Sequence, residues 1–445
     1  MALGGGTFTT QNKVLPGAYI NFVSASSANA QLSERGIATM PLMLDWGAEG
    51  DIFTVTNEDF QKNSLRIFGY AYDSDKLKGL RELFASTRIF YAYRLNGGGE
   101  KASCDIATAR YGGIRGNDIK IVIRSNADDA EAFDVMTYLE SALVDTQTVK
   151  DAAGLTDNNF VVFKSDCVLS ANAGIPLTGG TNAEVDGTSY QSYLDKIESY
   201  TFNTMGVAVT DDTTKKLFVA FNKRLRDEMG IKFQLVVYNL PSADYMGVIS
   251  VKNKCTDGAV TKDGKTTYPD EASLVYWVTG IQAGCAVNKS CQNMAYDGEY
   301  TVDTNYTQIE LQNAMKSGEF VLHKVNSDIR VLADINTMVT TTDTCGDVFK
   351  ENQTIRVIDQ LANDDAVLFN TKYLGVVPND AAGRISLWSD LVKIREALQN
   401  IRAIENFTDS DVTVERGESK KSVVVNGNIT VVNAMSQLYM TITVA

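Results

Sequence analysis

The sequence predicts a mixed α/β and α+β protein built from several domains. Its 445 residues exceed the roughly 100–200 residues of one typical domain. Short apolar strands alternate with amphipathic helices over residues 35–95, and the same alternation resumes at Ser189. Glycine clusters at 97–99 and 179–180 bracket the residues between these two blocks. Such bracketing is typical of an inserted domain.

The first block is expected to contain two strands and a helix. Residues 37–44 are mostly apolar and indicate a buried strand, whereas leucines and a phenylalanine between 77 and 84 share one helical face. Residues 88–95 place every second apolar side chain on one side, as a strand does. A further short strand is expected at 18–23, entered through Pro16 and Gly17.

The bracketed segment is predicted to contain strands at 119–124 and 160–163. Between them, apolar residues at helical spacing predict a helix from about Asp129, with these side chains toward the core: Phe133, Met136, Leu139 and Leu143.

The later part of the chain contains longer helical patterns. A stretch without charge at 272–287 follows Pro269 and two acidic residues and ends before Lys289, which fits the rules for helix starts and stops. The other expected helices cover about 190–200, 211 onward, 351–368 and 387–401. The expected strands cover 206–209, 232–238, 412–414, 422–425, 429–432 and 438–444.

Composition excludes several classes of function. The net charge of −14 argues against a nucleic-acid partner, which requires clustered positive charge. The single histidine, His323, leaves little room for imidazole chemistry or zinc binding. The six cysteines lack the spacing of a disulfide framework or a zinc site. The longest charge-free stretch, 14–33, contains proline, glycine and polar residues, so no membrane span is expected. These features predict a reduced, soluble protein made in the cytoplasm.

No motif for catalysis, cofactor or metal binding is complete. The glycine-rich segment 258–266 has five residues between its glycines where a phosphate-binding loop has four, so it indicates a polar hairpin turn. Cys285 and Cys291 are expected to be small buried hydrophobic residues. The paired aspartates at 128–129 and 211–212 are expected to cap helices, and the pair at 364–365 to lie on a solvated helix face.

Both ends of the chain are nearly free of charge, although 22 % of all residues are charged. The first 33 residues contain one charged side chain, Lys13, and residues 429–445 contain none. Residues 438–444 alternate between two faces, and an exposed edge strand of this kind invites pairing with another strand. It could pair within its own domain, or it could add to the sheet of another subunit.

Several stretches resemble the contractile tail sheath proteins of bacteriophages and phage-tail-like particles. The similarity extends from end to end and keeps the family's order, with its weakest match in the inserted segment. The stretches are Pro16–Phe22, Tyr111–Ile119, Leu177–Thr181, Gly280–Ser290, Gly318–Leu322, Arg330–Thr337, Ile355–Asp359, Tyr373–Asn379 with Gly383 and Arg384, and Ala434–Val444.

The resemblance implies a sheath core with an inserted domain and extended β arms at both ends. The implied parts are an N-terminal arm (1–20), a first core part (21–96), an outward-projecting inserted domain (97–180), a second core part (181–345), a tube-facing C-terminal domain (346–434) and a C-terminal arm strand (435–445). The arms would join sheets in adjacent subunits. Their implied interface residues are Phe8, Val14, Leu15, Tyr19, Leu438, Tyr439, Met440, Ile442 and Val444.

The resemblance also implies a function that needs no cofactor and no enzyme activity. Subunits would form stacked six-fold rings around a tail tube and contract to drive the tube through a cell envelope. Partners would be further copies of the chain, the tail tube protein, and the baseplate and tail terminator proteins, in a virion tail or tail-like particle assembled in the host bacterial cytoplasm. Charged residues on the helix around 387–405 would contact the tube or remain a solvated face: Lys393, Arg395, Glu396, Arg402 and Glu405.

Two other functions stay open at this point. The chain could be the sheath-like subunit of another contractile injection system, such as a type VI secretion sheath, although that system divides its sheath between two chains. It could also be an α/β enzyme with an unrecognised site. The sequence does not distinguish an infectious phage from a defective prophage or a bacteriocin-like tail.

Overall fold

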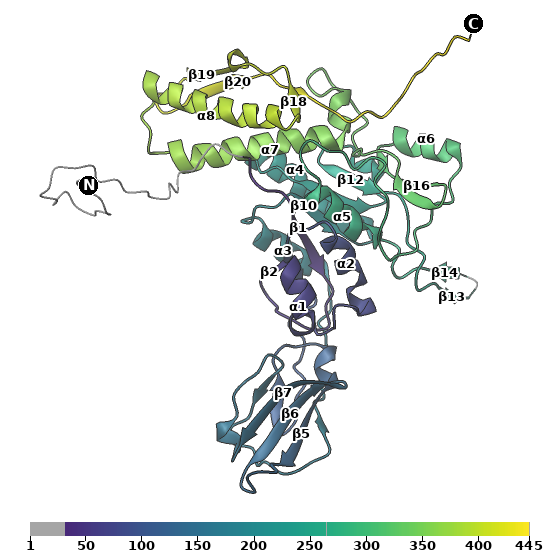
Figure 1. Cartoon of the computed structure of the whole chain (residues 1–445), viewed down its shortest axis with the longest axis vertical. Helices are drawn as coiled ribbons and strands as arrows, with labels where there is room; N and C mark the ends of the chain where they lie inside the picture. The colour runs from purple at the N-terminus through teal and green to yellow at the C-terminus, as the bar shows by residue number, and fades with distance from the viewer. Residues whose placement is uncertain (1–31, 264, 445) are drawn as a thin grey trace, which may run out of the picture.

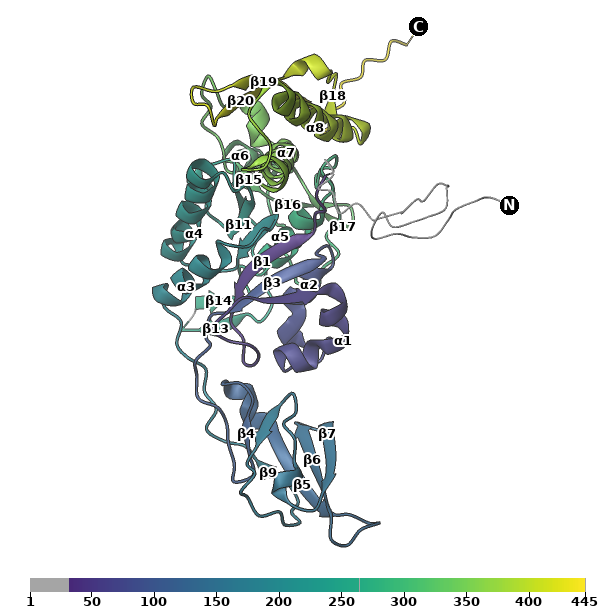
Figure 2. The same ribbon diagram turned by 90° about the vertical axis from the view of Figure 1, so that its left-hand side faces the viewer.

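A computed structural model describes residues 32–263 and 265–444. The molecule is elongated, with a β-rich domain at one end, a central sheet flanked by helices, and a mainly helical layer at the other end (Figures 1 and 2). The predicted mixed, multidomain class is confirmed. The strand expected at 18–23 lies outside the described residues.

The central domain is built on a seven-stranded sheet with the order β15-β12-β11-β10-β1-β3-β2. All neighbouring strands are parallel except β2, which runs antiparallel to β3 at the edge. The inner strands are buried on both faces, as parallel sheets covered by helices require. The strands are β1 (Ile37–Leu42), β2 (Phe53–Thr56), β3 (Ile89–Arg94), β10 (Thr204–Val207), β11 (Gln234–Tyr238), β12 (Val248–Val251) and β15 (Glu319–Phe320).

Helices cover both faces of this sheet. One face packs against α1 (Asn57–Phe68), α2 (Lys78–Phe84) and α5 (Leu274–Gly284). The other face packs against α3 (Gly187–Ile197) and α4 (Asp212–Arg224). All except α1 lie where the sequence predicted helices, because their apolar residues recur at helical spacing.

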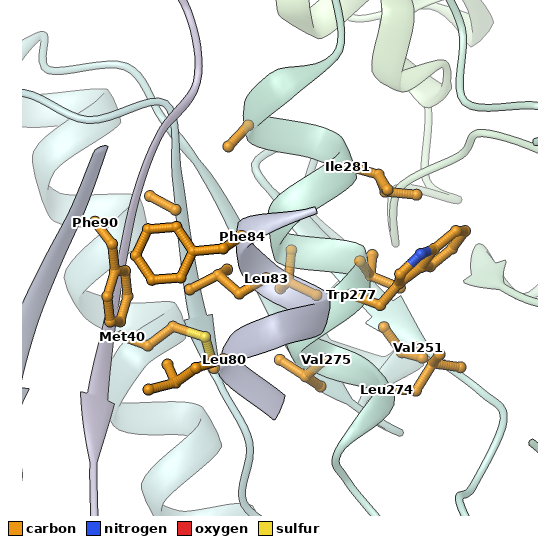
Figure 3. Packing of buried hydrophobic residues seen from close by; sticks show 14 of the residues in the cluster. Met40, Leu80, Leu83, Phe84, Phe90, Val251, Leu274, Val275, Trp277 and Ile281 are labelled. Carbon is orange, nitrogen blue, oxygen red and sulfur yellow. The ribbon is translucent and has the colours of Figure 1, made fainter. Parts of the chain in front are cut away.

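The helices α2 and α5 approach each other closely over the first face. Figure 3 shows Leu80, Leu83 and Phe84 of α2 packed beside Met40, Phe90 and the apolar residues of α5. A Cβ atom on Gly280 would lie 2.5 Å from the carbonyl oxygen of Leu83, so only glycine permits this approach. The charge-free stretch at 272–287 is therefore a buried core helix, as predicted.

Smaller elements complete the central domain. They are α6 (Gln308–Lys316), the hairpin β13–β14 (Val260–Lys262 and Lys265–Thr267) and the hairpin β16–β17 (Leu322–Val325 and Asp328–Val331). The first hairpin confirms that the glycine-rich segment 258–266 forms a polar turn. His323 lies in β16, and Cys285 and Cys291 are buried, both as predicted.

The inserted region consists of strands. Its four-stranded antiparallel sheet has the order β7-β6-β5-β9, and β4 pairs with β8 beside it. The strands are β4 (Ala107–Ala109), β5 (Ile119–Ser125), β6 (Phe133–Leu139), β7 (Ala142–Val149), β8 (Val161–Phe163) and β9 (Ile175–Pro176).

The helix predicted from Asp129 is wrong, because residues 133–149 form β6 and β7. In β6, Val135, Thr137 and Leu139 are buried at every second position, and this period is fixed by a continuous ladder to β5 and by a ladder to β7 that shifts register between Thr137 and Tyr138. Asp128 and Asp129 cap no helix. Their backbone N–H groups donate to the side-chain oxygen of Asn126 in the turn before β6.

Trp46, in the loop between β1 and β2, joins the inserted region to the central domain. Its indole is 1 % exposed and lies in the hydrophobic cluster of the inserted region. Its ring meets Tyr111 edge-on at 5.3 Å and stacks on Phe160 at 6.1 Å. The buried Arg115 lies over the Tyr70 ring and donates to the carbonyl of Gly69. These contacts hold the two parts in one relative orientation.

The last part of the chain contains two long helices and two small sheets. They are α7 (Asn352–Leu368), α8 (Ala381–Asn400), the pair β18–β21 (Ile404–Glu405 and Thr430–Val431) and the pair β19–β20 (Val412–Arg416 and Val423–Gly427). Apolar residues of both helices and of the strands form one core cluster. The predicted helices and the strands near 412–432 are confirmed.

Candidate assembly surfaces

The C-terminal segment presents its apolar side chains to solvent. Residues 432–444 form no strand, although the alternation at 438–444 predicted one, and the segment extends away from the body (Figure 1). Within residues 438–444, the exposed fractions of the apolar side chains range from 70 % for Met440 to 90 % for Val444, with Leu438, Tyr439 and Ile442 between them. Within the described part of the chain, this segment has no partner strand. A strand needs a ladder partner, and residues 32–263 and 265–444 supply none to this segment.

The predicted interface residues of the N-terminal arm, Phe8, Val14, Leu15 and Tyr19, lie outside the described residues.

The ribbon β19–β20 offers free strand edges close to this end of the molecule. Among the described residues its two strands pair only with each other. Val424 and Val425 remain about half exposed on β20, and the Trp388 indole of α8 attaches the ribbon by donating to the carbonyl of Val412 at 2.9 Å. Unpaired N–H and C=O groups on such edges can receive a further strand.

The charged residues predicted on the tube-facing helix occupy different environments. Lys393 and Glu396 are exposed on α8, where Lys393 donates to Asp390 at 3.1 Å. The prediction that Arg395 is exposed is wrong: it is 5 % exposed and forms two hydrogen bonds to Asp365 of α7, at 2.6 and 2.8 Å. Helical periodicity did not reveal this burial, because the face of α8 that carries Arg395 packs against α7. Arg402 and Glu405 are exposed but follow the end of α8 at Asn400.

The paired aspartates of α7 also differ from the prediction of a solvated face. Asp364 is buried and accepts hydrogen bonds from Ser33 and Gln360. Asp365 is the partner of Arg395. Both carboxylates therefore connect α7 to other segments. In contrast, Asp211 caps α4 as predicted, accepting from the N–H of Thr214 at 2.7 Å.

Three exposed apolar residues between α7 and the first turn of α8 were not predicted from the sequence. Leu374, Val376 and Ile385 are each at least 60 % exposed and lie at the end of a loop and the start of α8. Leu374 lines a cavity together with Arg384 and Lys421. The three apolar residues follow no secondary-structure period, so no pattern in the sequence marked them.

The described residues contain no group of three or more His, Cys, Asp or Glu side chains that could hold a metal ion. No helix in residues 32–444 is both long enough and apolar enough to cross a membrane. His323 borders a shallow polar cavity together with Asn288, Lys289 and the first residues of the C-terminal segment. Burial lowers the pKa of His323 below its ordinary value of 6.5.

We expect the imidazole of His323 to titrate below pH 6.5 in the folded protein. Because the folded state binds this proton less tightly than the unfolded chain, the free energy of unfolding should fall as the pH decreases through 6.5. NMR of the protein labelled in its histidine gives one imidazole signal, which the variant His323→Gln assigns by its loss. A measured pKa above 6.5 would contradict the expectation.

Comparison with known proteins identifies the family. Four family models match consecutive parts of the chain: tail sheath protein Gp18 domain III N-terminal region (35–95), phage tail sheath protein beta-sandwich domain (97–182), phage tail sheath protein central domain (183–337) and phage tail sheath C-terminal domain (345–445). The phage-like element PBSX protein XkdK of Bacillus subtilis is 32 % identical, with 99 % of this chain and 100 % of that protein covered. The chain belongs to the phage tail sheath protein family.

Sheath proteins of known structure share its architecture. A sheath tail protein from Desulfitobacterium hafniense is 37 % identical with a TM-score of 0.80, covering 94 % of this chain and 97 % of that one. One from Listeria innocua is 31 % identical with a TM-score of 0.76, covering 91 % and 93 %. The helical sheath of the anti-feeding prophage in its contracted state shares the fold, with 12 % identity, a TM-score of 0.57 and coverage of 97 % and 99 %. This sheath protein is thus a member of a family of structural tail subunits.

Proposed function

We propose that this sheath protein is the subunit of a contractile tail sheath that polymerises around an inner tail tube and contracts to drive the tube through the target cell envelope. The observation that carries the proposal is the exposed, charge-free C-terminal segment on a chain whose sheath domains extend from end to end. Contraction is supported by the likeness of the fold to a helical sheath in the contracted state.

The C-terminal segment is proposed to add as a strand to a neighbouring subunit, and the free edges of the ribbon β19–β20 are proposed to receive it. Four to six ladder hydrogen bonds contribute about 0.5–1.5 kcal/mol each. Burial of Leu438, Met440, Ile442 and Val444 contributes about 1.5–3 kcal/mol per side chain. Burial therefore supplies most of the affinity, and the ladder fixes the register. Contacts between two different surfaces need not close on themselves, so they generate rings or helical filaments.

The remaining surfaces receive roles consistent with this arrangement. The inserted domain is proposed to project outward. The exposed Lys393 and Glu396 of α8, with Arg402 and Glu405 beyond it, are proposed to face the tube protein, whereas the buried Arg395 is not. The baseplate and tail terminator proteins would contact the ends of the sheath in a virion tail or tail-like particle assembled in the host bacterial cytoplasm.

Electron microscopy of the purified chain tests the proposal. We expect the full-length protein to form tubes or stacked rings, and a variant lacking residues 436–445 to remain folded but unassembled. Matched controls exploit the alternation of the arm: Leu438→Ser with Met440→Ser changes one face and should abolish tubes, whereas Thr441→Ser with Thr443→Ser changes the other and should retain them. A truncated chain that still forms normal tubes would refute strand addition by this arm.

A further inference from the structure

The helix α7 makes direct contact with two places, called here the exits: the first described residues, 32–33 (the N-terminal exit), and residues 432–434, where the exposed C-terminal segment begins (the C-terminal exit). At the N-terminal exit, the hydroxyl of Ser33 donates to Asp364 at 2.6 Å, and its backbone N–H points to the same carboxylate at 3.3 Å. Gln360, one turn earlier on α7, donates to the hydroxyl of Ser33 at 2.6 Å and to its carbonyl at 3.2 Å. Leu32 packs against the C-terminal core beside these contacts. Residues 32–33 are therefore fixed on α7.

The C-terminal exit is held at the other end of the same helix. The side-chain amide of Gln353 donates to the carbonyl of Val432 at 3.0 Å and accepts from the backbone N–H of Ala434 at 2.9 Å. Thr354 and Asn433 are hydrogen-bonded at 3.2 Å. The Gln353 amide thus binds the backbone as a neighbouring strand would, directly before the exposed arm begins.

Three ion pairs fix α7 itself to the rest of the subunit. Arg356 contacts Asp334 at 3.3 Å, and Asp359 receives two hydrogen bonds from Arg226 at 2.6 and 2.7 Å, all four side chains being buried. The third pair joins Asp365 to Arg395 of α8. The pairs of Asp359 and Asp365 are bidentate, and charged pairs of this kind hold a fixed geometry.

We infer that α7 is the element that positions both arms for linkage between subunits, with Gln353, Thr354, Gln360 and Asp364 as its positioning residues. Gln353 and Asp364 are eleven residues apart, which places the two exits about 16 Å apart along the helix. Because α7 is fixed to the central domain and to α8, the exits keep one separation and direction when a subunit moves. Any bending during contraction then occurs in the arms beyond Ser33 and Ala434. This inference rests on the proposed function, since it assigns the linkage to these arms.

The four side chains are suited to this role because they are buried: Gln353, Gln360 and Asp364 contact backbone groups, and Thr354 contacts the side chain of Asn433. Each is at most 5 % exposed. The hydrogen bonds of these four side chains to residues 32–33 and 432–434 are called the root contacts. Loss of a root contact leaves α7 and its ion pairs in place but frees the first residues of an arm. Neighbouring subunits then lose register. Two or three hydrogen bonds with a net contribution of about 1 kcal/mol each correspond to an effect of roughly 30- to 150-fold on assembly.

Root variants of the full-length chain test the inference by two readouts. For Asp364→Ala, and separately for Gln353→Ala with Thr354→Val, we expect the concentration needed for tube formation to rise at least about tenfold, with a thermal unfolding midpoint close to that of the unchanged protein. Asp364→Asn keeps an acceptor oxygen and should restore most of the assembly. Asp365→Ala is the matched control, because it breaks the adjacent contact to α8 and should lower thermal stability more than assembly.

Hydrogen exchange of the unassembled chain supplies the second readout. We expect the backbone N–H groups of Ser33 and Ala434 to exchange more slowly than those of residues 436–444 in the unchanged protein. In the respective root variants, the same two groups should exchange at least about tenfold faster. Unprotected root groups, or root variants that assemble as well as the unchanged protein, would overturn the inference. Failure of the unchanged protein itself to form tubes would instead contradict the proposed function, and the exchange measurement would still decide whether α7 holds the roots.

Discussion

Replacing Asp334 by alanine is expected to destabilise the protein by about 3–5 kcal/mol, because it leaves the charge of Arg356 buried without its partner. Asp334 is 1 % exposed and also accepts hydrogen bonds from Gln282 at 2.7 Å, from the N–H of Cys291 at 2.9 Å and from Asn352 at 3.0 Å. Urea unfolding followed by circular dichroism measures the change.

A surface pair of the same residue types provides the control for Asp334. Asp328 and Arg330 lie 2.7 Å apart on β17, where both side chains are partly exposed. The variant Asp328→Ala should leave the unfolding midpoint nearly unchanged, since water replaces the lost partner. Equal effects of the two variants would show that burial adds nothing to the Asp334 contact.

The pH dependence of the free energy of unfolding should differ between Asp334→Ala and the unchanged protein. Burial alone would raise the pKa of Asp334, but the Arg356 charge and the hydrogen bonds outweigh it and hold the pKa below the ordinary value of 3.8. A carboxyl with a lowered folded-state pKa stabilises above its unfolded pKa, and this contribution is lost as the pH falls through the folded pKa. The stability advantage over Asp334→Ala should therefore be complete near neutral pH and shrink below about pH 4.

Replacing Trp46 by alanine should cost about 3–5 kcal/mol, the usual range for removing a large buried aromatic side chain. The change opens a cavity between Tyr111 and Phe160 and removes the indole donor to the carbonyl of Arg66. Because this side chain joins two domains, calorimetry should show the inserted region unfolding in a separate transition at lower temperature.

The conservative variant Trp46→Phe distinguishes packing from a general loss of folding. It fills most of the cavity and should restore a large part of the stability. A single unfolding transition in Trp46→Ala at the unchanged temperature would show that the orientation of the inserted region depends on other contacts, such as those of Arg115.

Local sequence patterns predicted the helices and buried strands that have one clear period. The charge-free run that forms α5 and the regular leucines of α8 are examples, because a side chain's burial there follows directly from its spacing. The segment 133–149 shows where this reasoning fails. Its apolar residues also fit a helical spacing, but pairing with the neighbouring strands β5 and β7 selects the strand, and the spacing of one segment does not show such pairing.

The candidate surfaces also include features that the sequence predicted and features that it could not predict. The charge-free C-terminal segment could be identified from composition alone, and the structure shows its apolar side chains exposed. The burial of Arg395 and Asp364 could not be predicted, because each depends on a side chain from a distant segment. The positions of Leu374, Val376 and Ile385 follow no secondary-structure period, so their exposure could be recognised only from the structure.

The amino-acid sequence was enough to establish the mixed fold class, the lack of a complete catalytic motif, the scarcity of charge at both ends and the resemblance to sheath proteins. These properties depend on composition, local spacing and the order of motifs, which are present in any conformation of the chain. The tertiary structure decided that one helix, α7, binds both chain exits and that Trp46 joins two domains. Each of those arrangements requires residues far apart in sequence to meet, and only the packing of whole elements brings them together.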